Sequence, residues 1–265
     1  MNKQTLVGLV LKVTILNEND KLLVMMNDTE GIIRLLVPSS CKSYSEMVLI
    51  SPLCILQVQT VDRQGLKLVT QLKLLRNFLS ISIKLEALSA AQGMIELCMQ
   101  LVNDPIIGMH EELILQLTRL EEVVNKQQRI VEVLAIAVQG SVHQLALGGY
   151  GLPLQVCARS GKELIPSLKN RSWNCSFIPQ EGFVIGILDE ASIVLNSSEV
   201  ALFQRIHKPI LPRCSNGELM GPAEVWIRLL DVILIWVDLY LPKPVHAFSI
   251  LRSCVQTSSL ISLLL

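Results

Sequence analysis

The change from strands to helices falls within residues 66–102, LKLVTQLKLLRNFLSISIKLEALSAAQGMIELCMQLV. Up to Leu75 the apolar residues come in short runs bounded by turn residues, which is typical of strands. From residue 81 onward apolar residues recur at helical spacing, beginning with Leu85, Leu88 and Ile95. The change of rhythm predicts a β region that gives way to a helical region near residue 80.

Four further short apolar runs precede this stretch, each followed by a turn or loop cluster. They are Thr5–Thr14, Lys21–Asn27, Ile32–Val37 and Leu53–Val61, and Leu66–Leu75 makes the fifth. Five short strands with no long helix between them predict a small closed sheet. The oligonucleotide-binding (OB) barrel is the commonest five-stranded form of such a sheet.

Beyond residue 81 the apolar stripes predict helices over 85–102, 113–124 and 130–145, and Gly148-Gly149 provides a stop signal for the third. Asn196 with Glu199 forms the pattern of a capping box, and further helices are predicted after Pro222 and from near Pro244. The predicted fold class is therefore α+β: an N-terminal five-stranded OB-fold β-barrel in residues 1–80 and a mainly α-helical C-terminal domain in residues 81–265. A small irregular insertion interrupts the helical domain at about 150–190.

Composition limits the function classes that the chain can belong to. The 265 residues are 51% apolar and 17% charged, which excludes a disordered chain. Lys plus Arg and Asp plus Glu both number 23, which excludes a strongly basic nucleic-acid coat. Residues 1–80 carry nine Lys/Arg and six Asp/Glu, so the β region is the more plausible part to face a polyanion.

Neither a disulfide framework nor a membrane span is expected. The seven cysteines form no C-x-x-C pair, which is typical of reduced thiols in a cytosolic protein. The longest apolar stretch, Val225–Leu241, contains three charges, Arg228, Asp231 and Asp238. A spanning helix needs about 20 mostly apolar residues with few charges, so we interpret this stretch as a core helix and expect no membrane partner.

Catalytic motifs are missing from the sequence. The four histidines lie far apart and form no H-E-x-x-H pattern, and no G-x-S-x-G, P-loop or G-x-G-x-x-G sequence occurs. Nothing in the sequence therefore favours an enzyme.

Several motifs together resemble a known family. Gly148-Gly-Tyr-Gly151 is followed by Cys157-Ala-Arg-Ser160-Gly and by Phe177-Ile-Pro-Gln-Glu-Gly182. Gly31-Ile-Ile-Arg34 follows a turn near the start, and Leu241-Pro-Lys-Pro244 lies near the end. Their order and spacing resemble the bacterial recombination mediator family RecO.

The resemblance implies a fold and a function. The fold is an OB barrel followed by a helical body. The function is non-enzymatic DNA repair and homologous recombination, in which the protein binds single- and double-stranded DNA, helps to load the RecA recombinase onto coated single strands, and anneals complementary strands. The implied partners are RecR and the C-terminal tail of the single-stranded-DNA-binding protein, and the implied location is cytoplasmic and nucleoid-associated.

The sequence departs from the family at the positions where many members hold zinc. These positions are Cys157, Ser160, Gly186 and Asp189. Structural zinc takes four ligands, usually cysteine or histidine, and Cys175 lies outside the matching spacing. We therefore expect no metal and no other cofactor, and we expect the insertion to be held by apolar packing of Val156, Phe177, Phe183 and Ile185.

Candidate DNA-binding residues lie in the β region: Lys12, Arg34, Lys42, Lys73 and Arg76. Residues 1–77 contain a single aromatic residue, Tyr44, so phosphate contacts have to dominate any DNA binding there. Such binding falls steeply with salt. The alternative is that these five residues are ordinary solvated strand ends.

Candidate docking residues for the partner tail are Arg119, Lys126 and Arg129, which border the apolar stripes of two helices. An apolar groove with a basic rim suits an acidic, hydrophobic peptide, and the alternative is exposed charges that flank a core helix. A second basic cluster, which faces either DNA or solvent, comprises Arg205, His207, Lys208 and Arg213.

Two other functions remain open. The chain is either an OB-plus-helix module that docks proteins with little direct DNA binding, or an enzyme that uses Cys157 as a nucleophile. A reactive thiol needs cationic neighbours or a helix N-terminus, and Arg159 is the one such neighbour in the sequence.

Overall fold

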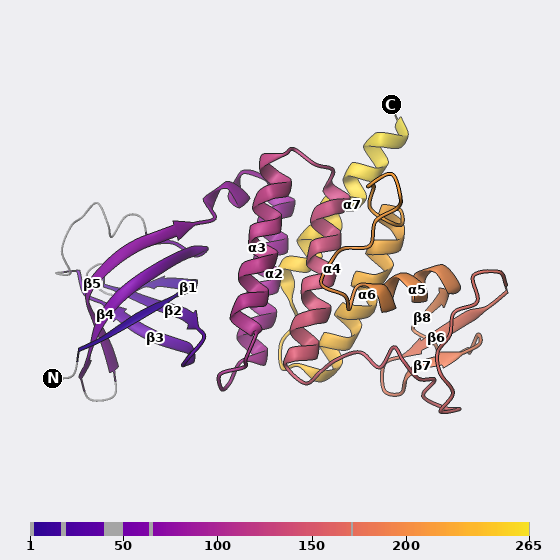
Figure 1. Ribbon diagram of the computed structural model, residues 1–265, viewed down its shortest axis with the longest axis horizontal. Coiled ribbons are helices and arrows are strands. Elements are labelled where there is room, and N and C mark those ends of the chain that lie inside the picture. Colours follow the sequence, from indigo (N-terminus) through magenta and orange to yellow (C-terminus); the bar gives the residue numbers. More distant parts are fainter. Residues whose placement is uncertain (1–2, 17–19, 40–49, 64–65, 171, 265) are drawn as a thin grey trace.

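The computed structural model describes residues 3–16, 20–39, 50–63, 66–170 and 172–264. Figure 1 shows an elongated molecule with a β-barrel at one end, a helical body in the middle and a small sheet at the other end. The last barrel strand ends at Asn77 and the first long helix begins at Leu85. The predicted α+β class, with strands first and helices after them, is confirmed.

Five strands form the barrel: β1 (Lys3–Ile15), β2 (Lys21–Asn27), β3 (Gly31–Val37), β4 (Cys54–Arg63) and β5 (Leu66–Asn77). They pair in the order β1-β2-β3-β5-β4, and β1 also pairs with β4. The ring closes through a short parallel contact between β3 and β5, in which Leu35 lies opposite Lys67 and Leu36 opposite Leu68. Each strand sends alternate apolar side chains into the barrel interior.

The barrel packs on the helical body through an apolar row on its outer face. Leu9 lies opposite Met26, and Met26 lies opposite Ile32, across β1, β2 and β3. All three belong to the core that the helices form, not to the barrel interior. A register shift between Val10 and Lys12 places Val10 inside the barrel and Leu11 against the helices. The joint between barrel and body is therefore a continuous apolar contact.

In the part of the chain that the structure describes, the body has a short 3-10 helix and six α-helices: η2 (Leu79–Ile83), α2 (Leu85–Leu101), α3 (Met109–Asn125), α4 (Ile130–Leu147), α5 (Ser197–Arg205), α6 (Ala223–Tyr240) and α7 (His246–Leu264). Figure 1 shows α4 between α3 and the pair α6 and α7. Among the described helices, α4 alone is long and apolar enough to cross a membrane, and 78% of it is buried within the protein. That burial is typical of the core helix of a bundle.

Helix boundaries follow the local signals in the sequence. Asn196 accepts hydrogen bonds from the backbone of Ser198 and Glu199, and the Glu199 carboxylate accepts one from the Asn196 backbone. This completes the predicted capping box of α5. Pro222 stands at the N-cap of α6, one residue before the first helical turn.

The insertion contains a small sheet of three strands, β6 (Asn174–Ile178), β7 (Gly182–Ile185) and β8 (Ile193–Asn196), in the order β7-β6-β8. Phe177 and Phe183 are fully buried, which confirms their predicted packing in the insertion. Their ring centroids lie 5.1 Å apart. The prediction for Val156 and Ile185 is wrong, because these side chains are 45% and 39% exposed. Ile185 ends the edge strand β7, and Val156 forms an isolated bridge with Glu163, whereas the two Phe rings pack against Phe203 and Trp236.

Candidate DNA-binding and partner-docking surfaces

Two of the predicted DNA-binding residues lie in one row on the outer face of the barrel. Lys12 on β1 is opposite Val24 on β2, and Val24 is opposite Arg34 on β3. Both charged side chains are exposed, and Val24 between them is buried. The row Lys12–Val24–Arg34 comes one step after the apolar row that packs on the body. The structure thus brings two cations together beside the joint between barrel and body.

The other predicted cations of the barrel lie elsewhere. Lys73 on β5 is opposite Gln57 on β4, and Gln57 is opposite Val7 on β1, so Lys73 occupies a different row. Arg76 bonds the Glu121 carboxylate on α3 at 2.8 Å, and its guanidinium lies 4.2 Å from the centre of the Phe78 ring. Arg76 therefore ties the barrel to the body. Lys42 lies outside the described residues.

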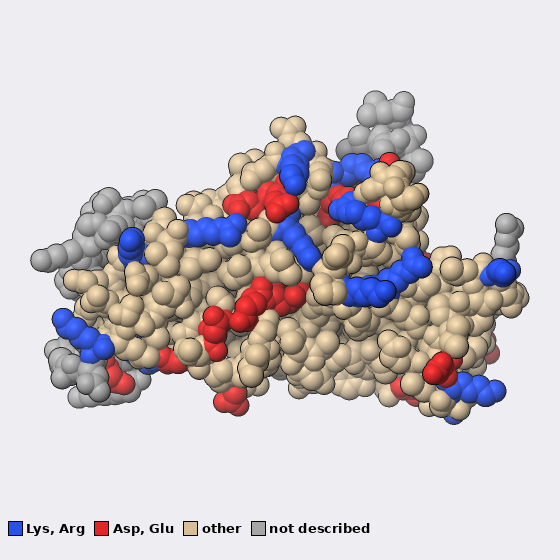
Figure 2. Space-filling model, viewed as in Figure 1, with Lys and Arg blue, Asp and Glu red and all other residues tan. Residues whose placement is uncertain are grey.

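Arg119 and Lys126 line a small groove of about 220 Å³ on the body. Glu122, Glu132 and Arg213 also line it, so its charge is mixed. The Lys126 ammonium pairs with Glu122, four residues earlier on α3, at 3.1 Å. Figure 2 shows the same mixture, with blue and red side chains interleaved over α3 and the neighbouring loop.

Arg129 lines a different, larger groove of about 1130 Å³. Its walls are the starts of α2, α4 and α6 together with α7. Lys84 and Arg129 stand at the N-caps of α2 and α4, and none of the three helix starts has a side-chain cap. Leu85 and Ile250 in this groove are 58% and 48% exposed. The three predicted docking residues are therefore divided between two grooves.

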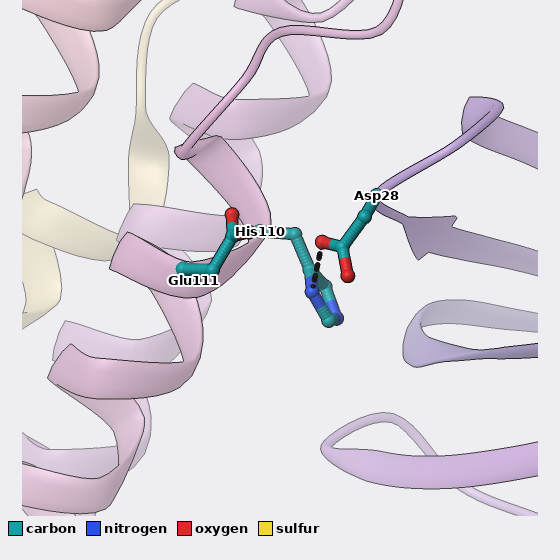
Figure 3. A group of neighbouring side chains, drawn as sticks. All are labelled: Asp28, His110 and Glu111. Atoms are coloured by element: carbon teal, nitrogen blue, oxygen red, sulfur yellow. Dashed lines mark ion pairs between the residues drawn. The ribbon is translucent and has the colours of Figure 1, made fainter.

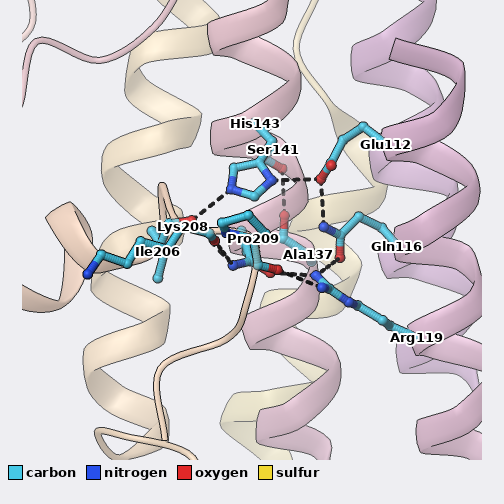
Figure 4. A network of polar contacts seen from close by, with 10 residues as sticks. Glu112, Gln116, Arg119, Ala137, Ser141, His143, Ile206, Lys208 and Pro209 are labelled. Atoms are coloured by element: carbon cyan, nitrogen blue, oxygen red, sulfur yellow. Dashed lines mark hydrogen bonds and ion pairs between the residues drawn. The ribbon is translucent and has the colours of Figure 1, made fainter. Parts of the chain in front are cut away.

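A buried polar network lies behind the small groove (Figure 4). His143 Nδ1 lies 2.8 Å from the Glu112 carboxylate, and His143 Nε2 lies 2.8 Å from the Ile206 carbonyl oxygen. A carboxylate and a carbonyl both accept hydrogen bonds, so the protonated imidazolium form of the ring satisfies both contacts. Burial opposes this charge, but the hydrogen bond with Glu112 outweighs it, and the pKa of His143 is raised. Burial likewise opposes the carboxylate, but hydrogen bonds from His143 and Gln116 lower the pKa of Glu112.

The same network fixes the segment that follows α5. Arg119 donates to the Gln139 side chain at 2.8 Å and to the Pro209 carbonyl at 2.6 Å. Gln139 in turn donates to the Lys208 carbonyl at 2.8 Å. Because Ile210 and Leu211 line the small groove, the network positions one wall of that groove. Arg119 thus acts as an internal tether as well as a groove residue.

The second basic cluster is also divided by the fold. Arg213 forms an ion pair with Glu132 at 2.8 Å, and the Arg205 guanidinium lies 3.1 Å from the Met220 sulfur. Burial lowers the pKa of the His207 imidazole, and nearby His143 lowers it further. Lys208 is exposed.

The residues at the family's zinc positions do not fit a metal ion. Gly186 has no donor side chain, and the Ser160 hydroxyl is engaged in a hydrogen bond with the Cys157 thiol. Cys157 is 2% exposed, and its sulfur accepts a hydrogen bond from the Ile185 backbone at 3.4 Å. Burial disfavours the thiolate, but these hydrogen bonds lower the pKa of Cys157 to about 7. The predicted cationic neighbour, Arg159, instead bonds Glu181 and Glu190.

One cluster of possible metal ligands was not predicted from the sequence. Asp28, His110 and Glu111 have donor atoms within 4.8 Å of one another. Asp28 follows β2, and the other two belong to the first turn of α3 (Figure 3). The Asp28 carboxylate lies 2.6 Å from His110 Nδ1. A helix N-terminus favours an anion over a cation, so this cluster is best explained as a second tether between barrel and body.

Comparisons with known proteins agree with the fold. Residues 1–78 match the family described as Recombination protein O N terminal, and residues 82–247 match Recombination protein O C terminal. A DNA repair protein RecO of Prochlorococcus marinus (strain MIT 9303) is 46% identical over 95% of both chains. One from Synechococcus sp. (strain WH7803) is 43% identical over 96% of this chain and 95% of the relative. One from Trichodesmium erythraeum (strain IMS101) is 26% identical over 95% of this chain and 94% of the relative. The chain therefore belongs to the RecO family of DNA repair and recombination proteins.

Proposed function

We propose that this protein is a non-enzymatic mediator that binds single- and double-stranded DNA on its barrel side and partner proteins on its helical body. In this role it anneals complementary strands and, together with RecR, helps to load the recombinase onto coated single strands. Its location is cytoplasmic and nucleoid-associated. The observation that carries the proposal is the pair of exposed cations, Lys12 and Arg34, that flank buried Val24 on a five-stranded barrel joined to a grooved helical body.

DNA binding by the barrel rests on charge. Lys12, Arg34 and Lys73 are exposed cations on its outer face, and the described barrel strands contain no aromatic ring. Phosphate contacts without stacking give modest affinity that is tolerant of sequence and sensitive to salt. A mediator that has to release its strands to a recombinase needs binding of this kind.

The large groove suits the C-terminal tail of the single-stranded-DNA-binding protein. Its exposed Leu85 and Ile250 offer an apolar floor, and Lys84 and Arg129 offer positive charge. Uncapped helix starts add partial positive charge from their free N–H groups. Glu86 and Glu224 also line the groove and set a limit on its affinity for an acidic peptide. The small groove, with its paired charges, is the weaker candidate.

Annealing of complementary strands tests both parts of the proposal. The wild-type protein is expected to anneal naked strands and strands coated with the single-stranded-DNA-binding protein. The double variant Lys84→Glu/Arg129→Glu is expected to retain annealing of naked strands and to lose most of it on coated strands. Lys162→Glu, an exposed charge near the small sheet, is the matched control.

The outcomes separate the candidate functions. Annealing of coated strands by the double variant at the wild-type rate would refute docking in the large groove. Failure of the wild-type protein to anneal naked strands at low salt, with the tail still bound, would instead favour the protein-docking module. That alternative draws support from the division of the barrel cations among different rows.

A further inference from the structure

The described part of the chain has two exposed aromatic side chains, and both lie at one end of the helical body. Tyr150 is 39% exposed and follows the glycines that end α4, and Tyr240 is 41% exposed and is the last residue of α6. Figure 1 shows α4 and α6 ending at the same end of the bundle, near the start of α3. The fold therefore brings together two motifs, the Gly-Tyr-Gly turn and the Leu241-Pro-Lys-Pro segment. Neither motif takes part in the DNA and partner binding proposed above.

A buried tryptophan, Trp236, contacts the Tyr240 ring and the backbone of Tyr150. The Trp236 indole N–H donates to the Tyr150 carbonyl at 2.8 Å, and the Trp236 and Tyr240 ring centroids lie 4.4 Å apart. Trp236 is itself 7% exposed and packs against Phe177 of the small sheet at 6.2 Å. A tyrosine side chain has few rotatable bonds, so it loses little conformational freedom when a flat ligand stacks on its ring. Contact with Trp236 restricts the Tyr240 ring further.

Exposed apolar side chains lie at this end of the body, and exposed charged residues flank Tyr240 in the chain, Asp238 before it and Lys243 after it. Ile107 is 95% exposed and Leu147 is 40% exposed, and Figure 2 shows few charged side chains along this lower edge of the body. Lys243 is exposed three residues beyond Tyr240, and its backbone N–H is fixed by the Gln100 side chain at 2.9 Å. Within the described residues, no ion pair holds the Lys243 ammonium.

We propose that Tyr150 and Tyr240 form a stacking platform for the unpaired bases of single-stranded DNA, with Lys243 bound to an adjacent phosphate. The inference rests on the proposed DNA binding and adds to it a surface on the body. Flat aromatic faces recognise any base, and a duplex keeps its base faces stacked and unavailable. The described strands of the barrel carry no ring, so the body supplies the base contacts and the barrel supplies phosphate contacts.

The test compares two DNA ligands of equal length and charge. One is an oligo(dT) strand, and the other is an abasic strand that keeps the phosphates and lacks the bases. The wild-type protein is expected to bind oligo(dT) about tenfold more tightly, as stacking on one or two rings provides. The variant Tyr150→Leu/Tyr240→Leu is expected to bind both strands equally, and Tyr150→Phe/Tyr240→Phe is expected to keep the preference.

Ile187→Ser is the matched control, since it removes an exposed aliphatic side chain from the insertion and no ring. It is expected to leave the preference unchanged. Equal binding of the two strands by the wild-type protein, or a preference retained by the Leu variant, would overturn the platform. If the wild-type protein binds neither strand, the proposed DNA binding itself is wrong.

A second measurement uses the unaltered protein and so does not depend on the folding of a variant. Strands that carry 5-iodouracil crosslink under ultraviolet light to aromatic rings that stack on the base. Crosslinks are expected at Tyr150 or Tyr240. Crosslinks confined to other residues would contradict the platform even if the Leu variant failed to fold.

Discussion

His143 shows how one residue ties three elements of the body together. Its ring bonds Glu112 on α3 and the carbonyl of Ile206 after α5, while the residue itself belongs to α4. Both side chains of the ion pair are about one-seventh exposed, 13% for His143 and 14% for Glu112. A charge-assisted hydrogen bond that is largely shielded from water contributes more than a surface ion pair does.

This pair predicts a defined dependence of stability on pH. Folding raises the pKa of His143, so its contribution is complete below the unfolded value of about 6.5 and is lost as the pH rises through the folded pKa. Folding lowers the pKa of Glu112, so its contribution is present above about 4.3 and is lost as the pH falls through the folded pKa. The part of the free energy of unfolding that depends on His143, measured by urea titration, is expected to decline above about pH 6.5 in the wild type.

In His143→Gln this decline should be absent, and the variant should be less stable by about 2 kcal/mol near pH 6 because Glu112 loses a charged partner. His246→Gln is the control, since this histidine is exposed and no ion pair to its side chain is described. A wild-type decline that persists unchanged in His143→Gln would contradict the assignment.

At the scale of elements, the contact between α2 and α7 depends on a glycine. A Cβ on Gly93 would lie 2.3 Å from two atoms of the Phe248 ring, which is fully buried. The two helices can therefore approach closely only where α2 has no side chain.

The expected effect of Gly93→Ala is destabilisation by about 1–3 kcal/mol, because overpacking a filled core outweighs the gain in helix propensity. Thermal or urea unfolding measures it. Gln92→Ala, one residue away and half-buried, is expected to change stability by about 0.5 kcal/mol or less. A Gly93→Ala variant as stable as the wild type would show that α7 packs differently on α2.

Elements with a strong local signal could be predicted from the sequence. The run Lys21–Asn27 has the predicted bounds of β2, and the Asn196–Glu199 capping box is present at the start of α5. The insertion could be predicted only in part, because no local signal distinguishes Phe183, which the body covers, from Ile185, which faces solvent two residues later. Which apolar residues are buried there is decided by contacts with α5 and α6.

The candidate surfaces were less predictable than the elements. The sequence indicates that Arg119 and Lys126 share a helix face, and both line the small groove. The sequence does not indicate that Arg119 donates a hydrogen bond to the Pro209 carbonyl. Nor does it indicate the ion pairs Arg76–Glu121 and Asp28–His110. These contacts join residues that lie 45 or more positions apart, and periodicity within one element carries no information about them.

At the scale of the whole molecule, the barrel and the body are joined by an apolar row and two polar tethers, Arg76–Glu121 and Asp28–His110. This joint fixes the row Lys12–Val24–Arg34 on one side of the molecule. We propose that the two exposed cations of this row, Lys12 and Arg34, contact the phosphates of DNA.

The salt dependence of affinity for a single-stranded oligonucleotide tests that claim most directly. Each phosphate contact on a single strand contributes about 0.7 to the slope of log affinity against log salt. Lys12→Gln/Arg34→Gln is therefore expected to weaken binding at low salt and to reduce the slope by about 1.4 relative to the wild type, with Lys162→Gln unchanged. A double variant whose affinity and slope both equal those of the wild type would contradict the claim.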